Sequence, residues 1–219
     1  MYLHRTIVYR SRKEVRALEG SLLAEQLAVC RRAGIPPPAR LRKAVRQLHW
    51  QALCGPAASI HCDVSECLEQ LAALLREVCP MPPQSICTNA PAGLYANAAP
   101  GELGRFLLQL IGCLFPLSGG TPLHLSAQQC GGRVLVCLQQ VRPLRKQKPP
   151  RSLTRQARCW ARKRGGLFFY GCSGSGFCCV LALLPGQAVR SRPPRYALWA
   201  FDRFSPVYSL LPGRLILPH

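Results

Sequence analysis

Apolar side chains recur at helical spacing through the first 80 residues and predict a helical region. Residues 21–33 form one candidate helix, and residues 41–52 form a second, with apolar positions at i, i+4, i+7 and i+11. Asp63 and Glu66 have the spacing of a capping box, and the stripe that follows predicts a third helix over residues 64–78. The expected core positions of the second helix are Leu41, Val45, Leu48 and Ala52.

After residue 80 the pattern changes to short strands around one apolar helix. Residues 85–88 and 93–96 predict two short strands, and residues 103–115, which are apolar nearly all round, predict a buried helix. Residues 122–128 and 133–140 have the alternation and the Gly-Gly turn of a β-hairpin. The sequence therefore predicts an α+β fold, an N-terminal helical hairpin followed by a mixed-sheet α/β sandwich with helices on one face.

The last third of the chain combines a basic stretch, a glycine-rich turn and an apolar run. Residues 142–164 carry ten Lys or Arg and no acid. Their mutual repulsion predicts a flexible loop, whose part from residue 152 could fold as a basic helix. Residues 171–176 form a glycine-rich loop, and residues 177–184 form an apolar helix or strand. The aromatic tail from Arg195 predicts a final strand or a pair of turns.

The charge pattern excludes several kinds of catalytic site. The chain has 219 residues, with 29 Lys and Arg against nine Asp and Glu, and a formal net charge of +20 at pH 7. Its only aspartates are Asp63 and Asp202, and Glu102 is the only acid between residues 80 and 201. An EF-hand or a two-metal phosphatase is therefore excluded, and a pair of catalytic carboxylates is disfavoured.

The 13 cysteines predict buried thiols in a reducing environment. No apolar segment typical of a secretory signal precedes them, no C-x-x-C motif occurs, and several lie within apolar runs. We therefore expect reduced cysteines that pack as small hydrophobic residues, no metal site, and a cytoplasmic location. The longest apolar run, residues 177–184, is far shorter than the ~20 residues of a membrane-spanning helix.

The order of these elements resembles the catalytic half of bacterial sensor histidine kinases, which belong to the GHKL superfamily of ATPases. Residues 96–140 are the most similar part, with a buried helix, a Gly-Gly turn and a hairpin; in the family an irregular lid, a glycine loop and an apolar helix follow. The predicted third helix resembles the one that leads out of the family's dimerisation hairpin. The resemblance implies a dimerisation-like region over residues 1–80 and an ATPase-like domain over residues 81–219, with residues 142–164 as the lid.

The resemblance also places five residues at the family's nucleotide-binding positions. Gln109 and Cys113 match asparagines that help to hold Mg²⁺ and the phosphates, and a thiol is a poor Mg²⁺ ligand. Gln139 stands where an Asp accepts the adenine amino group, and Gly174 and Gly176 match two glycines of the last glycine box. A tight turn before a buried element explains these glycines equally well. The resemblance thus implies no catalytic residue and no cofactor, with ATP and Mg²⁺ only if the altered site still binds them.

No histidine has the sequence context of the family's phospho-acceptor. That residue precedes an acid on the first helix of the dimerisation hairpin, whereas Trp50 and Gln51 follow His49. We interpret His49 as a helix-surface residue and expect no autophosphorylation. The leading hypothesis is a catalytically inactive signalling module that acts through its N-terminal helices, as a homodimer or by docking on a partner kinase or regulator.

The alternative hypothesis is a basic protein that binds nucleic acid or an anionic membrane face. The basic stretch supplies the cations, and Trp160 could stack on bases or anchor at an interface. A solvated loop in an Arg-rich protein explains the same stretch equally well. The candidate binding residues are Arg142, Arg145, Lys146, Lys148, Arg151, Arg155, Arg158, Trp160, Arg162, Lys163 and Arg164.

Overall fold

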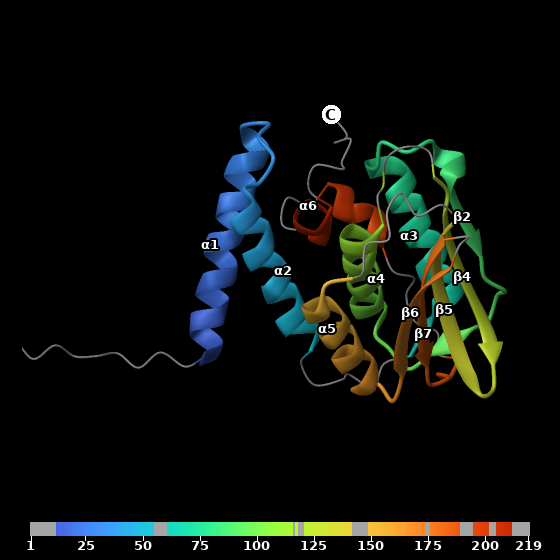
Figure 1. Cartoon of the computed structure of the whole chain (residues 1–219). Helices are drawn as coiled ribbons and strands as arrows, with labels where there is room; N and C mark the ends of the chain where they lie inside the picture. Colours follow the sequence, from blue (N-terminus) through green and yellow to red (C-terminus); the bar gives the residue numbers. More distant parts are fainter. Residues whose placement is uncertain are drawn as a thin grey trace, which may run out of the picture.

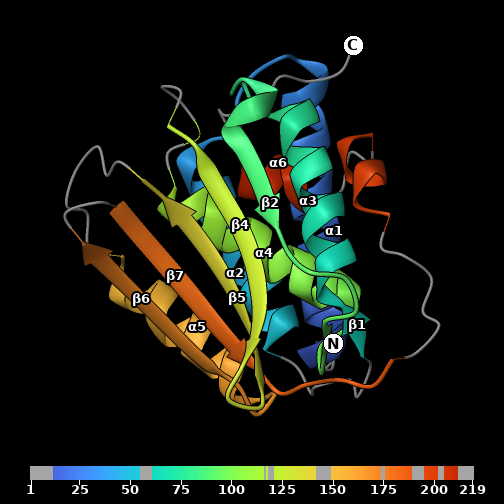
Figure 2. The ribbon, with the colours of Figure 1, turned by 90° about the vertical axis from the view of Figure 1, so that its right-hand side faces the viewer.

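The chain has an α+β architecture, in which N-terminal helices precede a mixed sheet that helices cover on one face (Figures 1 and 2). The expected fold class is therefore confirmed. This computed structural model describes residues 12–54, 61–115, 117, 121–141, 149–173, 176–188, 195–201 and 205–211.

Helices α1 (Arg12–Arg32) and α2 (Ala39–Leu53) form a hairpin that is separated from the sheet by other helices (Figure 1). Helix α1 begins earlier than the sequence pattern predicts. Leu27, Leu41 and Val45 form a small core between the two helices. Among the helices of the described ranges, none is long and apolar enough to cross a bilayer.

The predicted stripe of α2 is correct only in its first half. Ala52 is exposed and Leu48 is half-buried. Trp50 and Leu53 are buried instead and belong to the main core of the molecule. The buried positions move to another face of α2 along its length. The first half of the helix contacts α1, whereas the second half contacts the helices on the sheet.

Five strands form one mixed sheet in the order β2-β4-β5-β7-β6 (Figure 2). Within this sheet β2 and β4 run parallel, and the other neighbouring strands run antiparallel. The predicted hairpin is confirmed as β4 and β5, joined by Gly131 and Gly132 with φ of 55° and 70°. The strands are β2 (Ile86–Asn89), β4 (Leu123–Cys130), β5 (Arg133–Gln140), β6 (Leu167–Ser173) and β7 (Gly176–Leu183). A separate pair consists of β1 (Cys62–Asp63) and β3 (Tyr95–Ala96).

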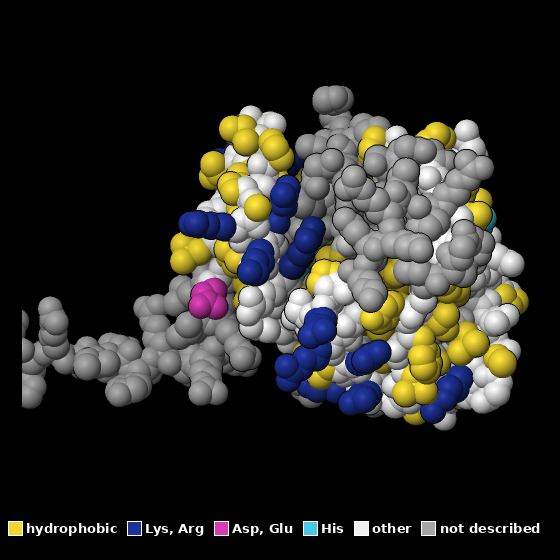
Figure 3. Space-filling model, in the orientation of Figure 1, with side chains coloured by type: hydrophobic (Ala, Val, Ile, Leu, Met, Phe, Trp, Pro, Cys, Tyr) yellow, Lys and Arg dark blue, Asp and Glu magenta, His cyan; other side chains and the backbone are white. Residues whose placement is uncertain are grey.

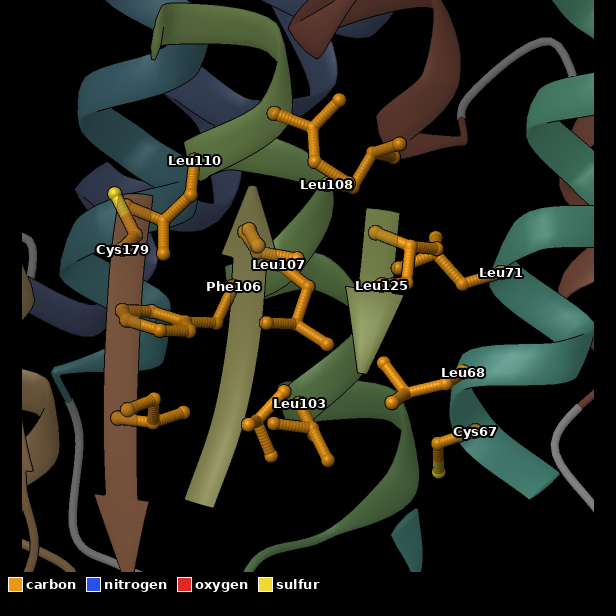
Figure 4. Packing of buried hydrophobic residues seen from close by; sticks show 14 of the residues in the cluster. Cys67, Leu68, Leu71, Leu103, Phe106, Leu107, Leu108, Leu110, Leu125 and Cys179 are labelled. Atoms are coloured by element: carbon orange, nitrogen blue, oxygen red, sulfur yellow. The ribbon is translucent and has the colours of Figure 1, made fainter. Parts of the chain in front are cut away.

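Helices α3 (Val64–Val78) and α4 (Pro100–Leu114) fill the space behind the sheet (Figure 4). The carboxylate of Asp63 accepts from the backbone N–H of Glu66 at 3.1 Å, so the predicted N-cap of α3 is confirmed. The predicted apolar stripe of α3 is buried throughout, and α4 is buried on nearly every side. Helix α3 therefore shares one core with the sheet.

The C-terminal half agrees with the sequence prediction only in part. Helix α5 (Arg151–Arg162) forms where the sequence allowed a basic helix from residue 152, while residues 142–148 lie outside the described residues. The apolar run forms strand β7, which is one of the two alternatives that the sequence left open. The aromatic tail forms a 3₁₀ turn, η2 (Tyr196–Ala200), and a short helix, α6 (Pro206–Leu210), and not a final strand.

Candidate functional site

Helix α4 carries one polar side chain, Gln109, that is fully buried. Its Nε2 donates to the backbone oxygen of Arg46 on α2 at 3.4 Å, and its Oε1 has no hydrogen-bond partner. A buried amide oxygen without a partner destabilises a fold by about 1–3 kcal/mol. Gln109 therefore marks a position at which an additional hydrogen-bond donor would be favourable.

Close backbone contacts hold α4 in place around this residue. A Cβ atom on Gly104 would lie 2.4 Å from the ring of Tyr196, and a Cβ on Gly112 would lie 2.2 Å from the backbone oxygen of Leu210. Glycine at these two positions lets η2 and α6 pack directly on the helix. The orientation of Gln109 is thus fixed by the C-terminal segment as well as by the sheet.

A cavity of about 540 Å³ lies between α2, α4 and α5. This volume is within the range of small-molecule sites, which is roughly 300–1,000 Å³. The lining combines polar and cationic side chains with a few apolar ones. The lining residues are Ala39, Arg42, Lys43, Arg46, Gln47, Trp50, Gln109, Gly112, Cys113, Pro150, Ser152, Leu153 and Gln156.

The cavity is cationic. Arg42, Lys43 and Arg46 line it from one face of α2, because residues three and four apart share a helix face. The amino end of α5, where the helix dipole is positive, lines it through Ser152 and Leu153. None of the lining residues has a carboxylate. On the face shown in Figure 3, Lys and Arg gather over α2 and α5 with little acid beside them.

This lining can hold an anion but offers no charged oxygen ligand for a metal ion. Arginine, lysine and the amino end of a helix are the groups that bind phosphate and carboxylate. Mg²⁺ prefers carboxylate oxygens and water. In the described ranges no group of three or more His, Cys, Asp or Glu side chains is placed to hold a metal ion.

The structure brings two of the five predicted nucleotide-binding residues together. Gln109 and Cys113 both line the cavity. Gln139 is exposed on the sheet face that has no helices. Gly176 opens β7, and Gly174 lies outside the described residues. The described residues of the expected glycine loop, 171–173 and 176, thus belong to strands β6 and β7, and α5, the helix within the basic stretch, is preceded by prolines.

The buried residue at the end of β5 is Gln140, one position beyond the predicted Gln139. Gln140 is 2% exposed, and its Nε2 donates to the backbone oxygen of Thr121 at 3.1 Å. The alternation of β5 identifies it, because the even-numbered positions from Val134 onward face the helices. Gln140 belongs to the core and is not among the residues that line the cavity.

Two of the residues proposed for nucleic-acid binding are buried. Trp160 has no exposed surface and stacks on Phe106 of α4, with ring centroids 4.0 Å apart. Arg164 is 3% exposed, and its Nη2 lies 2.5 Å from a carboxylate oxygen of Glu102. Trp160 and Arg164 are therefore core residues, and their assignment to a binding surface was wrong.

The other described members of that set lie on the outer side of α5. Lys163 follows the helix and donates to the backbone oxygen of Cys54, while Arg142, Arg145, Lys146 and Lys148 lie outside the described residues. The exposed arginines recur at the spacing of one helix face. This arginine stripe consists of Arg151, Arg155, Arg158 and Arg162.

His49 is partly buried against the C-terminal helix, and so it is not the surface residue that the sequence predicts. Its Nε2 lies 3.2 Å from the hydroxyl of Ser209 on α6. Burial, and to a smaller extent the neighbouring Arg105, lower the pKa of His49 to about 4. The imidazole is therefore neutral at pH 7, and its neighbour is a hydroxyl instead of an acid.

The cysteines differ in burial within the described part of the chain. The predicted packing as small hydrophobic residues holds for the four that are buried, whereas Cys130 and Cys159 are exposed. Cys137 and Cys178 have sulfur atoms 3.1 Å apart on β5 and β7. A hydrogen bond from the Cys178 thiol lowers the pKa of Cys137 to about 7, and the same contact raises the pKa of Cys178. The four buried cysteines are Cys62, Cys67, Cys79 and Cys179.

The three cations of α2 are not among the site residues that the sequence predicts. Arg42, Lys43 and Arg46 belong to a dispersed set of positive charges in the sequence, with no motif around them. Their spacing does place them on one helix face, and that signal was available. The sequence does not show that this face lies opposite α4 and the amino end of α5.

Comparison with known proteins shows likeness in structure only. No family model and no curated protein matches the sequence. The structure of full-length ShkA in complex with AMPPNP aligns with 84% of this chain at 19% identity and a TM-score of 0.53. This chain covers 46% of ShkA, somewhat less than half of its length.

Histidine kinases are also among the similar structures. AdeS from Acinetobacter baumannii aligns with 80% of this chain and 98% of its own, at 13% identity and a TM-score of 0.48. The histidine kinase domain of the E. coli osmosensor EnvZ aligns with 62% of this chain and 94% of its own, at 14% identity and a TM-score of 0.41. At these identities the comparisons show the fold alone. The chain has N-terminal helices and a mixed five-stranded sheet with helices, and it resembles the histidine kinase fold.

Proposed function

We propose that this chain is a signal-transduction module with a histidine-kinase-like fold that has lost phosphotransfer. The observation that carries the proposal is the lining of the cavity on α4. Gln109 and Cys113 stand where the resemblance expects nucleotide-binding asparagines, and no lining residue has a carboxylate. Mg²⁺ prefers charged oxygen ligands and binds thiols poorly, so Mg-ATP lacks its usual protein ligands here. The resemblance of the sequence to sensor histidine kinases suggests the signalling class, and the likeness to ShkA supports the fold.

The state of His49 supports the loss of autophosphorylation. A phospho-accepting imidazole must expose a ring nitrogen to the γ-phosphate of ATP. Here Nε2 of His49 contacts Ser209 on α6, and the side chain is partly buried. The residue that comes directly after it is Trp50 and not an acid. The module therefore acts through binding and not through phosphate transfer.

The outer face of the helical hairpin is the proposed contact with a partner. Leu22 and Val29 on α1 are 58% and 54% exposed. A largely apolar groove of about 750 Å³ runs beside them between α1 and α2. Exposed apolar side chains that flank a groove are typical of protein interfaces. A second copy of the chain is the first candidate occupant, and a partner kinase or regulator in the cytoplasm is the alternative.

We expect the purified full chain to show neither autophosphorylation nor ATP hydrolysis, and to sediment as a dimer. Incubation with γ-labelled Mg-ATP should leave the protein unlabelled and release no phosphate above the blank. The Leu22→Glu/Val29→Glu variant should sediment as a monomer, because two carboxylates would be buried in the interface. Labelling or turnover would contradict the loss of catalysis.

The matched control for the dimer replaces two apolar residues that are equally exposed elsewhere. Leu198 and Phe201 are 55% and 62% exposed, at η2 and just after it. The Leu198→Glu/Phe201→Glu variant should remain a dimer. A wild-type chain that stays monomeric at every concentration, or a control that dissociates equally, would contradict self-association through the hairpin.

The arginine stripe of α5 supports a second candidate function, binding of nucleic acid. Four exposed guanidinium groups on one helix face can each contact a phosphate. We expect any such affinity to fall linearly in a plot of log K against log salt concentration. The Arg155→Gln/Arg158→Gln variant should reduce that slope by about two, measured by fluorescence anisotropy. An unchanged slope, or no binding near physiological salt, would rule this candidate out.

A further inference from the structure

Three cations on one face of α2 lie close together without an acid to balance them. Arg42 and Arg46 are four residues apart, Lys43 and Arg46 are three apart, and all three line the cavity. Like charges at these spacings repel each other and destabilise a helix. No other lining residue is acidic, so the cavity itself supplies no counter-charge. An anion bound between α2 and α4 would remove this repulsion.

The amino end of α5 adds a second source of positive potential. The helix has 12 residues, and its N-cap position, Pro150, supplies no side-chain hydrogen bond. No acid occupies its first turn. The hydroxyl-bearing Ser152 lines the same cavity. The first-turn N–H groups and this hydroxyl are donors of the kind that hold phosphate at helix ends.

Two buried polar atoms at the cavity lack hydrogen-bond partners. They are Oε1 of Gln109, a residue with no exposed surface, and Nε of Arg46. Both residues line the cavity, Gln109 from α4 and Arg46 from α2. One atom accepts a hydrogen bond and the other donates one. A phosphate oxygen can satisfy the arginine, and a hydroxyl or amino group on the same ligand can satisfy the glutamine.

We propose that this cavity binds a phosphate-bearing ligand without a divalent cation, and that Arg42, Lys43 and Arg46 neutralise its charge in place of a metal ion. The inference deepens the proposed function and rests on it, because the loss of metal ligands is what leaves the cationic face of α2 to carry the phosphate. The ligand contacts the hairpin through α2 and the sheet layer through α4 and α5. Binding therefore fastens the hairpin to the sheet and couples ligand concentration to the surface that the hairpin presents.

The test is isothermal titration of the full chain with sodium pyrophosphate and with ADP, each in EDTA and each in excess Mg²⁺, at constant ionic strength. We expect binding in EDTA that Mg²⁺ does not strengthen. The Arg42→Gln/Lys43→Gln/Arg46→Gln variant should bind at least about tenfold more weakly, because several charge-assisted hydrogen bonds are lost. The unfolding transition of this variant shows whether it is folded. We expect the transition to be retained, because the substitutions remove the repulsion between the three cations.

The matched control removes three charges from the arginine stripe, outside the cavity. The Arg155→Gln/Arg158→Gln/Arg162→Gln variant should keep its affinity within about twofold, since these side chains do not line the site. Equal losses in the two variants would show diffuse attraction and overturn the proposal. Binding that requires Mg²⁺ would overturn it together with the proposed loss of catalysis. If neither ligand binds under any of these conditions, the phosphate proposal is wrong, and the proposed loss of catalysis is unaffected.

The comparison of ADP with pyrophosphate distinguishes a nucleotide from a simple phosphate compound as the ligand. Tighter binding of ADP than of pyrophosphate, with the difference lost in Gln109→Met, would support a nucleotide whose hydroxyl or amino group reaches Oε1. Equal affinities, unchanged in Gln109→Met, would support a simple phosphate compound held by the α2 cations alone. In both cases the phosphate is held by the same three side chains.

Discussion

Replacing Trp160 with alanine should lower the free energy of unfolding by about 4 kcal/mol. The indole is completely buried and lies nearly parallel to the ring of Phe106, with an interplanar angle of 12°. The guanidinium carbon of Arg164 lies 4.3 Å from the centre of the indole ring on α5. Removing a large buried aromatic side chain costs roughly 3–5 kcal/mol, through lost burial and the cavity that remains. Urea unfolding followed by circular dichroism measures this loss.

The control for Trp160 is an exposed residue on the same helix. Arg158→Ala should change the free energy of unfolding by no more than about 0.5 kcal/mol. A similarly small effect for Trp160→Ala would mean that the indole is on the surface, where it could stack on nucleic acid. The Trp160→Phe variant should be intermediate, because a smaller ring keeps part of the contact with Phe106.

Replacing Glu102 with alanine should lower the free energy of unfolding by about 3 kcal/mol. The carboxylate accepts from Nε and Nη2 of Arg164, at 3.2 and 2.5 Å. The Arg164 side chain is 1% exposed, whereas that of Glu102 is 25% exposed. A guanidinium cannot lose its proton at ordinary pH, so the variant leaves a buried cation with only the carbonyl oxygens of Trp160 and Leu53. Breaking one side of such a pair costs roughly 3–5 kcal/mol, and the partial exposure of the carboxylate favours the lower value.

A double replacement tests whether the unpaired charge is the cause. Glu102→Ala/Arg164→Met removes both charges and should recover a large part of the lost stability. Glu77, which is exposed on α3, provides the matched control, and Glu77→Ala should have little effect. If the double variant were no more stable than Glu102→Ala, the loss would come from packing and not from the buried charge. Equilibrium unfolding in urea distinguishes these outcomes.

The sequence predicted the elements of the central fold correctly, because the buried positions of each element recur at one regular spacing. The stripe of α3, the apolar α4 and the alternation of β4 and β5 each repeat without interruption, and each element has one buried face. The wrong assignment on α5 concerns Trp160 and not the helix, which the sequence allowed from residue 152. The apolar positions of α5, Leu153, Ala157 and Trp160, have helical spacing, but the surrounding charges dominate the composition. The helical spacing indicates the buried face correctly, whereas the charge density led to the assignment of Trp160 to a binding surface.

The cavity could not be predicted to the same extent. Gln109 and Cys113 were identified from the resemblance, but Arg42, Lys43 and Arg46 lie in a different part of the chain. Their meeting depends on how α2 crosses α4, and that angle depends on packing through residues such as Trp50. A sequence pattern specifies the faces of a helix. It does not specify which other helix each face contacts.

The pairing of β5 with β7 has a consequence for how the chain is made. These strands are neighbours in the sheet, although α5 and β6 lie between them in the sequence. During synthesis β5 exists before β7, and its free edge exposes unpaired N–H and C=O groups, which favour pairing with another nascent chain. The ribosome adds the arginine-rich segment during this interval. Its positive charge repels similar chains at the stage when the unfinished sheet is most prone to aggregate.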